Sequence, residues 1–586
     1  MPKDSPQIAA ADNPAPRALR VTLGQYSDAG RKPANQDFHG ALIPEPGPLR
    51  TLKGITLAVA DGISSSPVSA EASETAVKAL MTDYYATPAA WTVRTAATRV
   101  IAATNAWLQG QNTSVADVNA GRVCTLSALI LKGREGHVLH VGDSRVSRFD
   151  GTSLEPLTED HRVTLSPEES YLGRALGVDR TVEIDYSRVP LRVGEHYLLT
   201  TDGVHDHITA RTLRSTLEEH GDDLEAAAAA LADAALAAGS TDNLTVQILR
   251  IDALPDAEGD LGLDSLHLPV PPLPNPGDTL DGLTIQRQIH ATARSHVFLA
   301  TDPRGRRLAL KIPATEMALD VDYRKRFVLE EWIARRLTSA HVLRAAQVSG
   351  RRSALYVVTE FVEGITLRQW MTDHPTPDLD AVRDIVAQIA AGLGAFHRRE
   401  MIHQDLRPEN IMIDPNGTVK IIDFGSTSVA GVEEAAPGTL GQVPGTFQYT
   451  APEYFAGDAI SWRSDQYALG VIAYEMLTGR LPFGARVARV RSQRDLMRLS
   501  YRSARDEDDS QVPAWMDVAL RRATQPDAAR RYDALSEFVA DLKRPGSTWR
   551  SSHHVPLAAR NPVRFWQGIS AILAVLCIIL AAQLAG

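Results

Sequence analysis

The sequence predicts a multidomain protein in which an α/β domain is followed by a two-lobed α+β domain and a C-terminal transmembrane helix. Three observations lead to this fold class. The chain has 586 residues, too many for one hydrophobic core. A proline-rich stretch separates two halves with different strand and helix patterns, and the last apolar run carries no charge. With 44% hydrophobic and 23% charged residues, the composition is that of a globular protein.

The first half has the pattern of an α/β domain. After residues 1–19, which we expect to be flexible, strand-like runs such as GITLAVADG and TLSALILKG alternate with alanine-rich helical stretches. Residues 72–108 predict a pair of helices, and residues 224–238 predict another helix that ends at Gly239. We therefore expect this domain to occupy residues 20–251.

Residues 252–279 are first acidic and then rich in proline, so we interpret them as a semi-rigid linker. Prolines at 269, 271, 272, 274 and 276 favour extended polyproline geometry and preclude a helix. Beyond the linker, strand-like segments continue to Phe361 and then give way to mostly helical ones. This order predicts a two-lobed domain over residues 280–543.

The C-terminal segment predicts a membrane anchor. Residues 565–584 read FWQGISAILAVLCIILAAQL, and about 20 apolar residues suffice for a helix to cross a bilayer. Residues 544–564 form a basic juxtamembrane linker that includes Arg550, Arg560 and Arg564. The positive-inside bias then predicts a single pass through the inner membrane, with both domains in the cytoplasm. The alternative is a buried C-terminal helix of the preceding domain.

Charge and cysteine content exclude two further classes. The formal net charge is −10 and no extended basic stripe precedes the tail, which argues against a nucleic-acid partner. The two cysteines, Cys124 and Cys577, lie in very different settings. We therefore expect no disulfide framework, and we expect the protein to reside in a reducing compartment.

The first half repeatedly places an aspartate in a short polar motif, often where an apolar run ends. The motifs are NQD at 35–37, ADG at 60–62, GDSR at 142–145, TDG at 201–203 and TDN at 241–243. One Asp-Gly after a strand is usually a turn. Several carboxylates gathered in one pocket repel one another unless cations bind them, and oxygen-only ligands favour Mg²⁺ or Mn²⁺ over zinc.

In this order the motifs, together with LTEDH at 157–161, resemble the PPM (type 2C) metal-dependent serine/threonine protein phosphatases. The resemblance implies a β-sandwich flanked by helices, with two metal ions at one end that activate a water for attack on phosphorus. It assigns metal ligation to Asp37, Asp61, the carbonyl of Gly62, Asp202 and Asp242, and a third metal to Asp143.

This half departs from the family pattern at three places. Gln36 stands where an acidic residue is usual, and ISSSPVS follows Asp61-Gly62 where glycines are common. The phosphate-binding arginine of the family falls on Lys32, with Arg31 beside it. Because lysine lacks the bidentate fork of arginine, we expect weaker binding of the substrate phosphate.

The second half carries the residues that phosphoryl transfer from ATP requires. Lys311 in LALKIP is a cation inside a strand, and Glu330 is its expected partner, with Glu331 as the alternative. HQDLRPEN supplies Asp405 as base and Asn410 as metal ligand, and IIDFG supplies Asp423. GTFQYTAPE contains Thr446 and Glu453, and the later helical region contains Asp465 and Gly470.

This set resembles the Hanks-type serine/threonine protein kinases. The resemblance implies a two-lobed kinase fold that binds ATP with Mg²⁺. It places Lys311, Glu330, Asp405 and Arg407 in catalysis and Asn410 and Asp423 on the metal. The ATP-binding residues that it implies are Lys311, Ile289, Val297, Ala309, Glu360 and Val362.

Three departures bear on kinase activity. The phosphate loop reads IHATARSHV, so that His290, Thr292 and Ser295 replace glycines that let the backbone approach phosphate, although Arg294 or His290 could add charge. Gln404 replaces the arginine that pairs with a phosphorylated loop. Arg407 replaces a lysine, which keeps the charge and changes the shape.

The sequence therefore predicts a membrane-anchored enzyme of bacterial signalling that phosphorylates protein serine and threonine with ATP and hydrolyses phosphoserine and phosphothreonine. Its expected partners are protein substrates, ATP and the membrane. Hydroxyls of its own kinase half are candidate substrates, namely Ser426, Thr427, Ser428 and Thr439. The alternatives are a phosphatase regulated by a nucleotide-binding pseudokinase domain, and a non-catalytic membrane scaffold.

Overall fold

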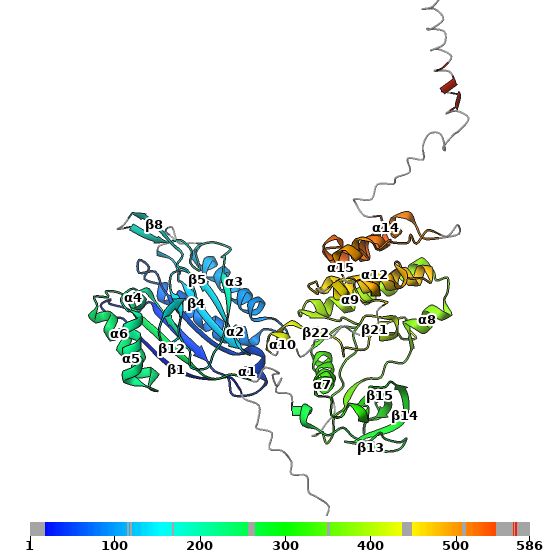
Figure 1. Cartoon of the computed structure of the whole chain (residues 1–586), viewed down its shortest axis with the longest axis horizontal. Coiled ribbons are helices and arrows are strands. Elements are labelled where there is room, and N and C mark those ends of the chain that lie inside the picture. Colours follow the sequence, from blue (N-terminus) through cyan, green and yellow to red (C-terminus); the bar gives the residue numbers. More distant parts are fainter. Residues whose placement is uncertain are drawn as a thin grey trace, which may run out of the picture. The chain divides into compact units, whose positions relative to one another are not determined.

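The computed structural model describes residues 18–113, 117, 120–166, 169–255, 264–347, 352–435, 448–456, 458–490, 492–506, 511–545, 566–567, 569–570 and 573 (Figure 1). The chain forms two compact units. The first holds the described residues up to Glu363, together with Ala395–Gln404 and the described part of Ile422–Pro444. The second holds Gly364–Gly394, Asp405–Ile421 and the described residues from 448 onward.

Two five-stranded sheets form the centre of the N-terminal α/β domain, in the first unit. One sheet has the order β1 (Arg20–Asp28), β12 (Leu244–Ala253), β11 (His196–Thr200), β6 (Arg145–Phe149) and β7 (Leu154–Pro156). The other has the order β10 (Asp185–Pro190), β5 (Glu135–Val141), β4 (Leu126–Lys132), β3 (Ile55–Asp61) and β2 (Asp37–Leu42). All the pairings within these two sheets are antiparallel.

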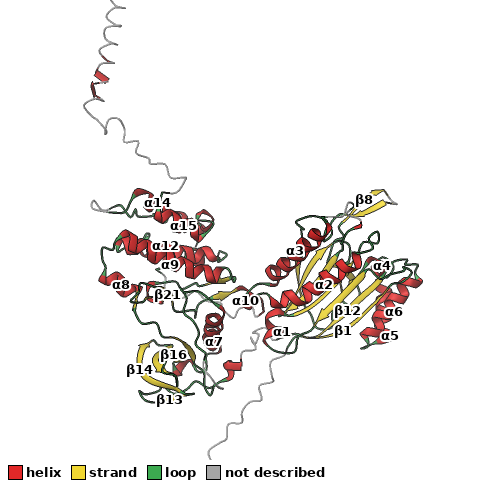
Figure 2. Cartoon of the chain, turned by 180° about the vertical axis from the view of Figure 1, so that it is seen from behind, coloured by secondary structure: helices red, strands yellow, loops and turns green. Residues whose placement is uncertain are grey.

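Three buried clusters show that this domain has four layers. Side chains of β3 and β4, among them Leu57 and Leu129, pack against Tyr197 and Leu249 of the other sheet. The outer face of each sheet is covered by helices (Figure 2). These are α2 (Ser69–Ala86) and α3 (Val93–Asn112) on one side, and α4 (Asp202–His205), α5 (Ala210–His220) and α6 (Leu224–Ala237) on the other. The β-sandwich flanked by helices that the sequence predicted is confirmed.

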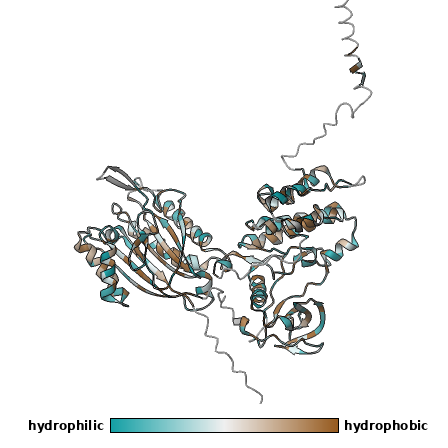
Figure 3. Ribbon diagram, in the orientation of Figure 1, coloured by the Kyte–Doolittle hydropathy of each residue, from teal (hydrophilic) through white to brown (hydrophobic). Residues whose placement is uncertain are grey.

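The strand sequences explain why both faces are covered. Strands β3 and β4 are mostly apolar and are buried throughout, apart from the half-buried Asp61 at the end of β3. Hydrophobic residues lie along these central strands in Figure 3. The short helix α1 (Pro48–Lys53) precedes β3, and β8 (Arg162–Ser166) and β9 (Glu169–Leu172) form a separate hairpin.

The small lobe of the C-terminal half also lies in the first unit. It is an antiparallel sheet of β13 (Thr279–Leu280), β14 (Leu283–Ala291), β15 (Ser295–Thr301), β16 (Arg307–Pro313) and β17 (Val357–Glu360), with helix α7 (Val321–Arg336). A 3-10 turn follows β16 at Thr315–Met317. Strands β19 (Met401–Ile402) and β22 (Ser428–Val429) pair with each other, and α10 (Ala430–Ala435) follows β22.

The second unit is mostly helical. It contains α8 (Leu367–Asp373), α9 (Leu379–His397, shared at its end with the first unit), α11 (Glu453–Ala456), α12 (Trp462–Thr478), α13 (Gln493–Met497), α14 (Ala514–Ala523) and α15 (Leu535–Lys543). Three 3-10 turns lie at Pro408–Asn410, Gly484–Arg489 and Ala528–Arg530. A small sheet joins β18 (Ile365–Thr366), β20 (Ile411–Ile413) and β21 (Val419–Ile421). The buried ion pair between Arg531 and Glu453 links two parts of this unit.

The expected linker contacts the small lobe in its second half. A 3-10 turn forms at Asp264–His267, and Leu268 and Val270 pack beside Tyr323 and Phe327. Arg324 of α7 donates hydrogen bonds to the carbonyls of residues 266 and 268. This part of the linker is therefore held against the lobe.

The predicted membrane helix falls almost wholly outside the described residues, which include only five of residues 565–584. Within the part of the chain that the structure describes, no helix combines the length and apolar character that a bilayer crossing requires.

Candidate functional site

The carboxylates of the first half meet at one end of the two sheets. Asp37 begins β2 and Asp61 ends β3, and the two residues stand directly opposite each other in the antiparallel pair. Like charges in this position repel each other. Gly62 is held beside them because its N–H donates to the carbonyl of Gln36 over 3.1 Å.

Three further aspartates reach the same region from other elements. Asp202 begins α4 directly after β11, and Asp242 precedes β12. A Cβ on Gly203 would lie 3.1 Å from the Cβ of Asp242, so the turns that carry Asp202 and Asp242 are in close contact. Asp143 follows β5 in the GDSR motif, and its neighbour Ser144 is fully buried.

The electrostatic state of these carboxylates indicates a site built for cations. Burial raises the pKa of Asp37 to about 7, although hydrogen bonds from Thr245 and Thr201 act against the rise. Burial, followed by the charge of Asp37, raises the pKa of Asp61 well above its usual range. Burial and the charge of Asp143 raise the pKa of Asp202 to about 6. A bound cation would reverse these shifts.

Two buried oxygens in this cluster have no hydrogen-bond partner. They are Oδ1 of Asp37 and Oδ1 of Asp202, both buried. The other oxygen of Asp37 accepts from the hydroxyl of Thr201 over 2.8 Å. Buried carboxylate oxygens without a partner are costly, and hard divalent cations favour such ligands.

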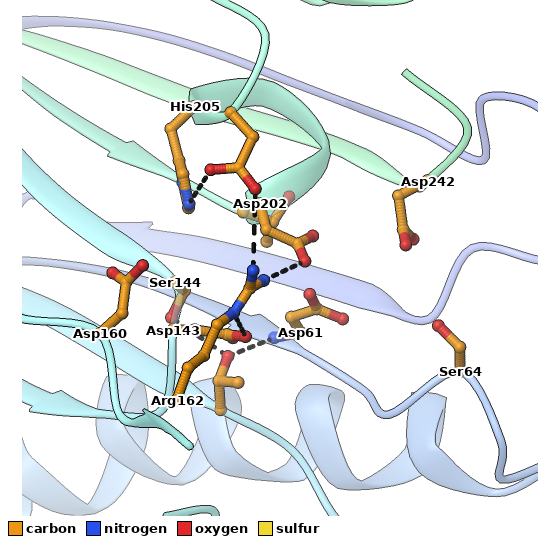
Figure 4. Close-up of polar contacts among 12 residues, drawn as sticks. Asp61, Ser64, Asp143, Ser144, Asp160, Arg162, Asp202, His205 and Asp242 are labelled. Carbon is orange, nitrogen blue, oxygen red and sulfur yellow. Dashed lines mark hydrogen bonds and ion pairs between the residues drawn. The ribbon is translucent and has the colours of Figure 1, made fainter. Parts of the chain in front are cut away.

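The arginine after the LTEDH motif extends into this cluster from β8 (Figure 4). Nε of Arg162 lies 2.7 Å from Oδ2 of Asp143, and an Nη of the same guanidinium lies 2.7 Å from Oδ2 of Asp202. Asp206 lies farther away, at 3.8 Å. Although burial opposes it, hydrogen bonding to Asp143 keeps the pKa of Arg162 above its ordinary value.

A second cation occupies the other side of the cluster. Nζ of Lys32 forms an ion pair with Asp242 and donates to Oγ of Ser64 over 2.5 Å. Arg31 points elsewhere, since its guanidinium donates to the carbonyl of Leu236 over 3.5 Å. Of these two neighbouring basic residues, Lys32 and not Arg31 therefore lies beside the carboxylates.

Gln36 has a structural role in the loop after β3. Its side-chain amide donates to the carbonyl of Ser66 and to the hydroxyl of Ser69, each over 2.7 Å. The amide thus holds the ISSSPVS segment, which replaces the glycines of the family pattern.

The five aspartates fit a hard divalent metal by their chemistry, and three of them form ion pairs with Lys32 or Arg162. Among the described residues, no three histidine, cysteine, aspartate or glutamate side chains are gathered closely enough to hold an ion as they stand. Arg162 and Lys32 occupy carboxylate oxygens of Asp143, Asp202 and Asp242 that an ion would use. Metal ligation by these residues stays a prediction.

In the small lobe, Lys311 contacts two carboxylates. Its Nζ lies 2.7 Å from Oε2 of Glu330 and 3.8 Å from Oδ1 of Asp423. Burial opposes the charge of Lys311, but Asp423 and Glu330 outweigh it and raise the pKa of this lysine. Glu331, the alternative partner, pairs with Arg335 and Arg352 instead.

The residues expected to bind ATP, apart from Val362, lie on the strands of the small lobe. Along β16, Leu308, Leu310 and Ile312 are buried in the core while Ala309 and Lys311 are half-buried on the opposite face. Val297 of β15 pairs with Lys311, and Ile289 lies at an irregularity of β14. Glu360 ends β17, and Val362 follows it.

The loop between β14 and β15 is stabilised by a side chain where glycines are usual in the family. Oγ1 of Thr292 accepts hydrogen bonds from the backbone N–H groups of Arg294 and Ser295, over 3.2 Å and 3.0 Å. The carbonyl of Arg294 in turn accepts from the hydroxyl of Tyr323 over 2.7 Å. Two backbone donors of this loop are therefore already bonded within the chain.

The second unit holds the remaining predicted kinase residues. Nδ2 of Asn410 donates to the carbonyl of Asp405 over 2.9 Å and to its carboxylate over 3.1 Å, so the two side chains lie together. Arg407 donates to Glu409 over 2.8 Å, and Glu409 also pairs with Arg368. Thr446 lies outside the described residues.

The sequence reasoning missed Arg162, Thr201 and Ser64. A basic residue directly after an acidic motif was the available signal for Arg162, and Thr201 stands within the TDG motif. Nothing in the sequence marks Ser64, because its contact with Lys32 joins residues 32 positions apart.

Each half of the chain matches the model of a known protein family. A protein phosphatase 2C family model matches residues 26–239, and a protein kinase domain model matches residues 284–553. The chain is 31% identical to the serine/threonine-protein kinase PrkC of Bacillus subtilis over 260 residues, which are 44% of this chain and 40% of that protein. It is 36% identical to PknA of Mycobacterium tuberculosis over 218 residues, which are 36% of this chain and 50% of that protein.

The chain thus spans about half or less of the length of these curated relatives. Among solved structures, PppA, a key regulatory component of T6SS in Pseudomonas aeruginosa, matches with a TM-score of 0.35 and 23% identity. That match covers 40% of this chain and 100% of PppA. The chain therefore carries a protein phosphatase 2C domain followed by a protein kinase domain.

Proposed function

We propose that this chain phosphorylates serine and threonine residues of proteins with ATP and also removes phosphate from such residues. The observation that carries the proposal is the presence of two separate sets of site residues in one chain. One is the aspartate cluster around Asp61 and Asp202, and the other is Lys311 with Glu330 and Asp423.

For hydrolysis, Asp37, Asp61, the carbonyl of Gly62, Asp202 and Asp242 would hold two Mg²⁺ or Mn²⁺ ions. Bound ions of this kind lower the pKa of a shared water so that it can attack phosphorus. Lys32 would bind the substrate phosphate, and its hydrogen bond to Ser64, which orients the ammonium group, supports this role. Thr201 fixes Asp37 by donating a hydrogen bond to its Oδ2.

For phosphorylation, Lys311 supplies the cation for the ATP phosphates, and Glu330 fixes its position. Asp423 and Asn410 would hold Mg²⁺, which neutralises the phosphate charge. Asp405 is the base that accepts the proton of the substrate hydroxyl, and its contact with Asn410 fixes its orientation. Arg407 keeps a positive charge near this base.

The chain's own hydroxyls differ as substrates. Thr427 and Ser428 are buried, while Ser426 is half-buried and Thr439 lies outside the described residues. Of the three hydroxyls that the structure describes, that of Ser426 is thus the most accessible to either activity. On other proteins, the reacting groups would be serine and threonine for the kinase activity and their phosphorylated forms for the phosphatase activity.

We also propose that residues 565–584 tether the chain to the inner membrane, with both domains in the cytoplasm. The uncharged run and the arginines at 550, 560 and 564 support this. Cell fractionation of the full chain and of a variant lacking residues 565–586 tests it. The full chain should sediment with membranes and the shortened chain should not.

Two assays test the enzymatic proposal. Purified full chain should release phosphate from a phosphothreonine peptide with Mn²⁺, and Asp61→Asn should lose this activity. With labelled ATP and Mg²⁺, the chain should phosphorylate a protein substrate, and Lys311→Met should not. Absence of the first activity in the wild type contradicts the phosphatase half, and absence of the second contradicts the kinase half.

One observation favours a second candidate, a phosphatase regulated by a nucleotide-binding pseudokinase domain. Thr292 ties up two backbone donors of the phosphate loop, as described above. Nucleotide binding without transfer of label, together with Mn²⁺-dependent phosphatase activity, would establish this alternative.

A further inference from the structure

The short segment after Asp423 contains a strand and a helix, and both make contacts with other parts of the first unit. We call residues 428–435, which form β22 and α10, the docked segment. Val429 pairs with Met401, and Ser428 pairs with Ile402. Before the docked segment, Phe424 is buried against the ring of Phe396. All of these residues belong to the first unit.

The backbone of α10 is in close contact with the N-terminal α/β domain. The N–H of Gly431 donates to the carbonyl of Ala90 over 2.8 Å. A Cβ at Gly431 would lie 2.7 Å from the carbonyl oxygens of both Ala89 and Trp91, so that a larger residue does not fit there. On the other side, a Cβ at Gly133 would lie 2.7 Å from the carbonyl oxygen of Ala435.

The centre of this contact is a buried ion pair. Nζ of Lys132 lies 3.0 Å from Oε2 of Glu434, with side chains 1% and 8% exposed. The same carboxylate accepts from the N–H of Val93 over 2.8 Å, at the first residue of α3, where the helix dipole favours a negative charge. Burial lowers the pKa of Lys132, and Glu434 counteracts this shift.

A second carboxylate supports the same arrangement. The side chain of Glu400 accepts from the N–H of Thr92 over 2.9 Å and from the hydroxyl of Thr95 over 2.6 Å. The backbone carbonyl of Glu400 accepts from the N–H of Ala430, the first residue of α10. Glu400 thus joins the start of α3 to the start of α10.

From these contacts we propose that the phosphatase 2C domain carries a docking surface for the kinase's own 428–435 segment. The surface consists of Lys132, Gly133 and the N-terminal turn of α3, and its occupant is the acidic helix α10. A buried lysine needs a carboxylate partner, and Glu434 fills that position. At Gly431 and Gly133 the backbone of the segment and the backbone of the surface are so close that neither glycine has room for a side chain.

Docking also fixes the position of Asp423. Four residues separate Asp423 from the docked segment, and the N–H of Gly425 donates to Oδ1 of Asp423 over 2.9 Å. A segment that is held at 428–435 leaves this short connection little freedom. Kinase activity therefore depends on the phosphatase domain through Lys132; this consequence rests on the proposed kinase function.

Hydrogen exchange measured by mass spectrometry on the full chain tests the docking itself. Lys132→Met and Glu434→Gln each leave one buried charge without its partner, and we expect exchange in peptides covering 428–435 to rise about tenfold or more. The double variant, which buries neither charge, should exchange more slowly than either single variant. The control is Lys78→Met, which removes an exposed lysine paired with Glu74.

Two further readouts complete the experiment. Mn²⁺-dependent hydrolysis of a phosphopeptide should stay unchanged in Lys132→Met, which shows that the phosphatase domain is folded. Transfer of label from ATP should fall about tenfold in both single variants relative to Lys78→Met. Unchanged exchange in peptides covering 428–435 would overturn the docking surface, whether or not the wild type is an active kinase. Faster exchange with unchanged kinase activity would overturn the dependence on Lys132.

Discussion

Arg162 and Asp202 form an ion pair of 2.7 Å at the centre of the aspartate cluster. The same guanidinium binds Asp143, so one side chain connects two predicted metal ligands. Arg162 holds Oδ2 of both aspartates, so a divalent ion that binds these oxygens competes with the guanidinium.

Replacing Arg162 should therefore tighten metal binding. Two partly exposed ion pairs contribute about 1 kcal/mol together, so Arg162→Gln should bind Mn²⁺ about fivefold more tightly. Isothermal titration calorimetry measures this directly. Arg148→Gln, which removes an arginine paired with Glu155 outside the cluster, is the matched control. Equal or weaker binding in Arg162→Gln would show that the guanidinium does not compete with the ion.

Lys32 should determine the affinity for the substrate phosphate. Lys32→Ala removes a charged hydrogen-bond donor, and KM for a phosphothreonine peptide should rise about tenfold or more. Lys32→Arg restores a bidentate fork and should lower KM below that of the wild type. Steady-state kinetics with saturating Mn²⁺ measure KM for both variants and for the wild type. A KM in Lys32→Ala equal to the wild-type value would assign phosphate binding to another group.

Thr292 should limit the affinity of the kinase site for ATP. Thr292→Gly frees the N–H groups of Arg294 and Ser295 and removes the side chain from the loop, so KM for ATP should fall severalfold. Thr292→Ser keeps the hydroxyl and should behave as the wild type does. A higher KM in Thr292→Gly would mean that the hydroxyl stabilises the loop in its ATP-binding form.

The ion pair between Arg531 and Glu453 should be essential for the stability of the second unit. Two hydrogen bonds of 2.7 Å join the side chains, which are 0% and 4% exposed. Glu453→Gln takes the carboxylate away from a buried guanidinium and leaves it only neutral hydrogen-bond acceptors, and removal of one partner of such a pair costs about 3–5 kcal/mol. Differential scanning calorimetry should show a transition lowered by about 10 °C. Arg530→Gln, at an exposed neighbour, should shift it little.

The predicted layers follow from local patterns in the sequence. Mostly apolar runs such as those of β3 and β4 indicated buried strands, and alanine-rich stretches indicated the covering helices α2, α3 and α6. The aspartate motifs at strand ends indicated Asp37 and Asp61, which the register of β2 and β3 places opposite each other.

The contacts that the sequence could not predict join residues far apart along the chain. Arg162 reaches Asp202 across 40 positions, and Lys132 reaches Glu434 across 302 positions. No periodicity or spacing encodes such pairs, because tertiary packing sets them. The same holds for Arg31, which lies next to Lys32 and yet contacts Leu236.

The central claim is that one molecule both adds and removes protein phosphate. The most direct measurement follows label from ATP on the full chain, first with Mg²⁺ and then after Mn²⁺ is added and ATP is removed. We expect Asp405→Asn to acquire no label, the wild type to acquire label and lose it, and Asp202→Asn to acquire label and keep it. Equal labelling and equal loss in all three proteins would contradict the account.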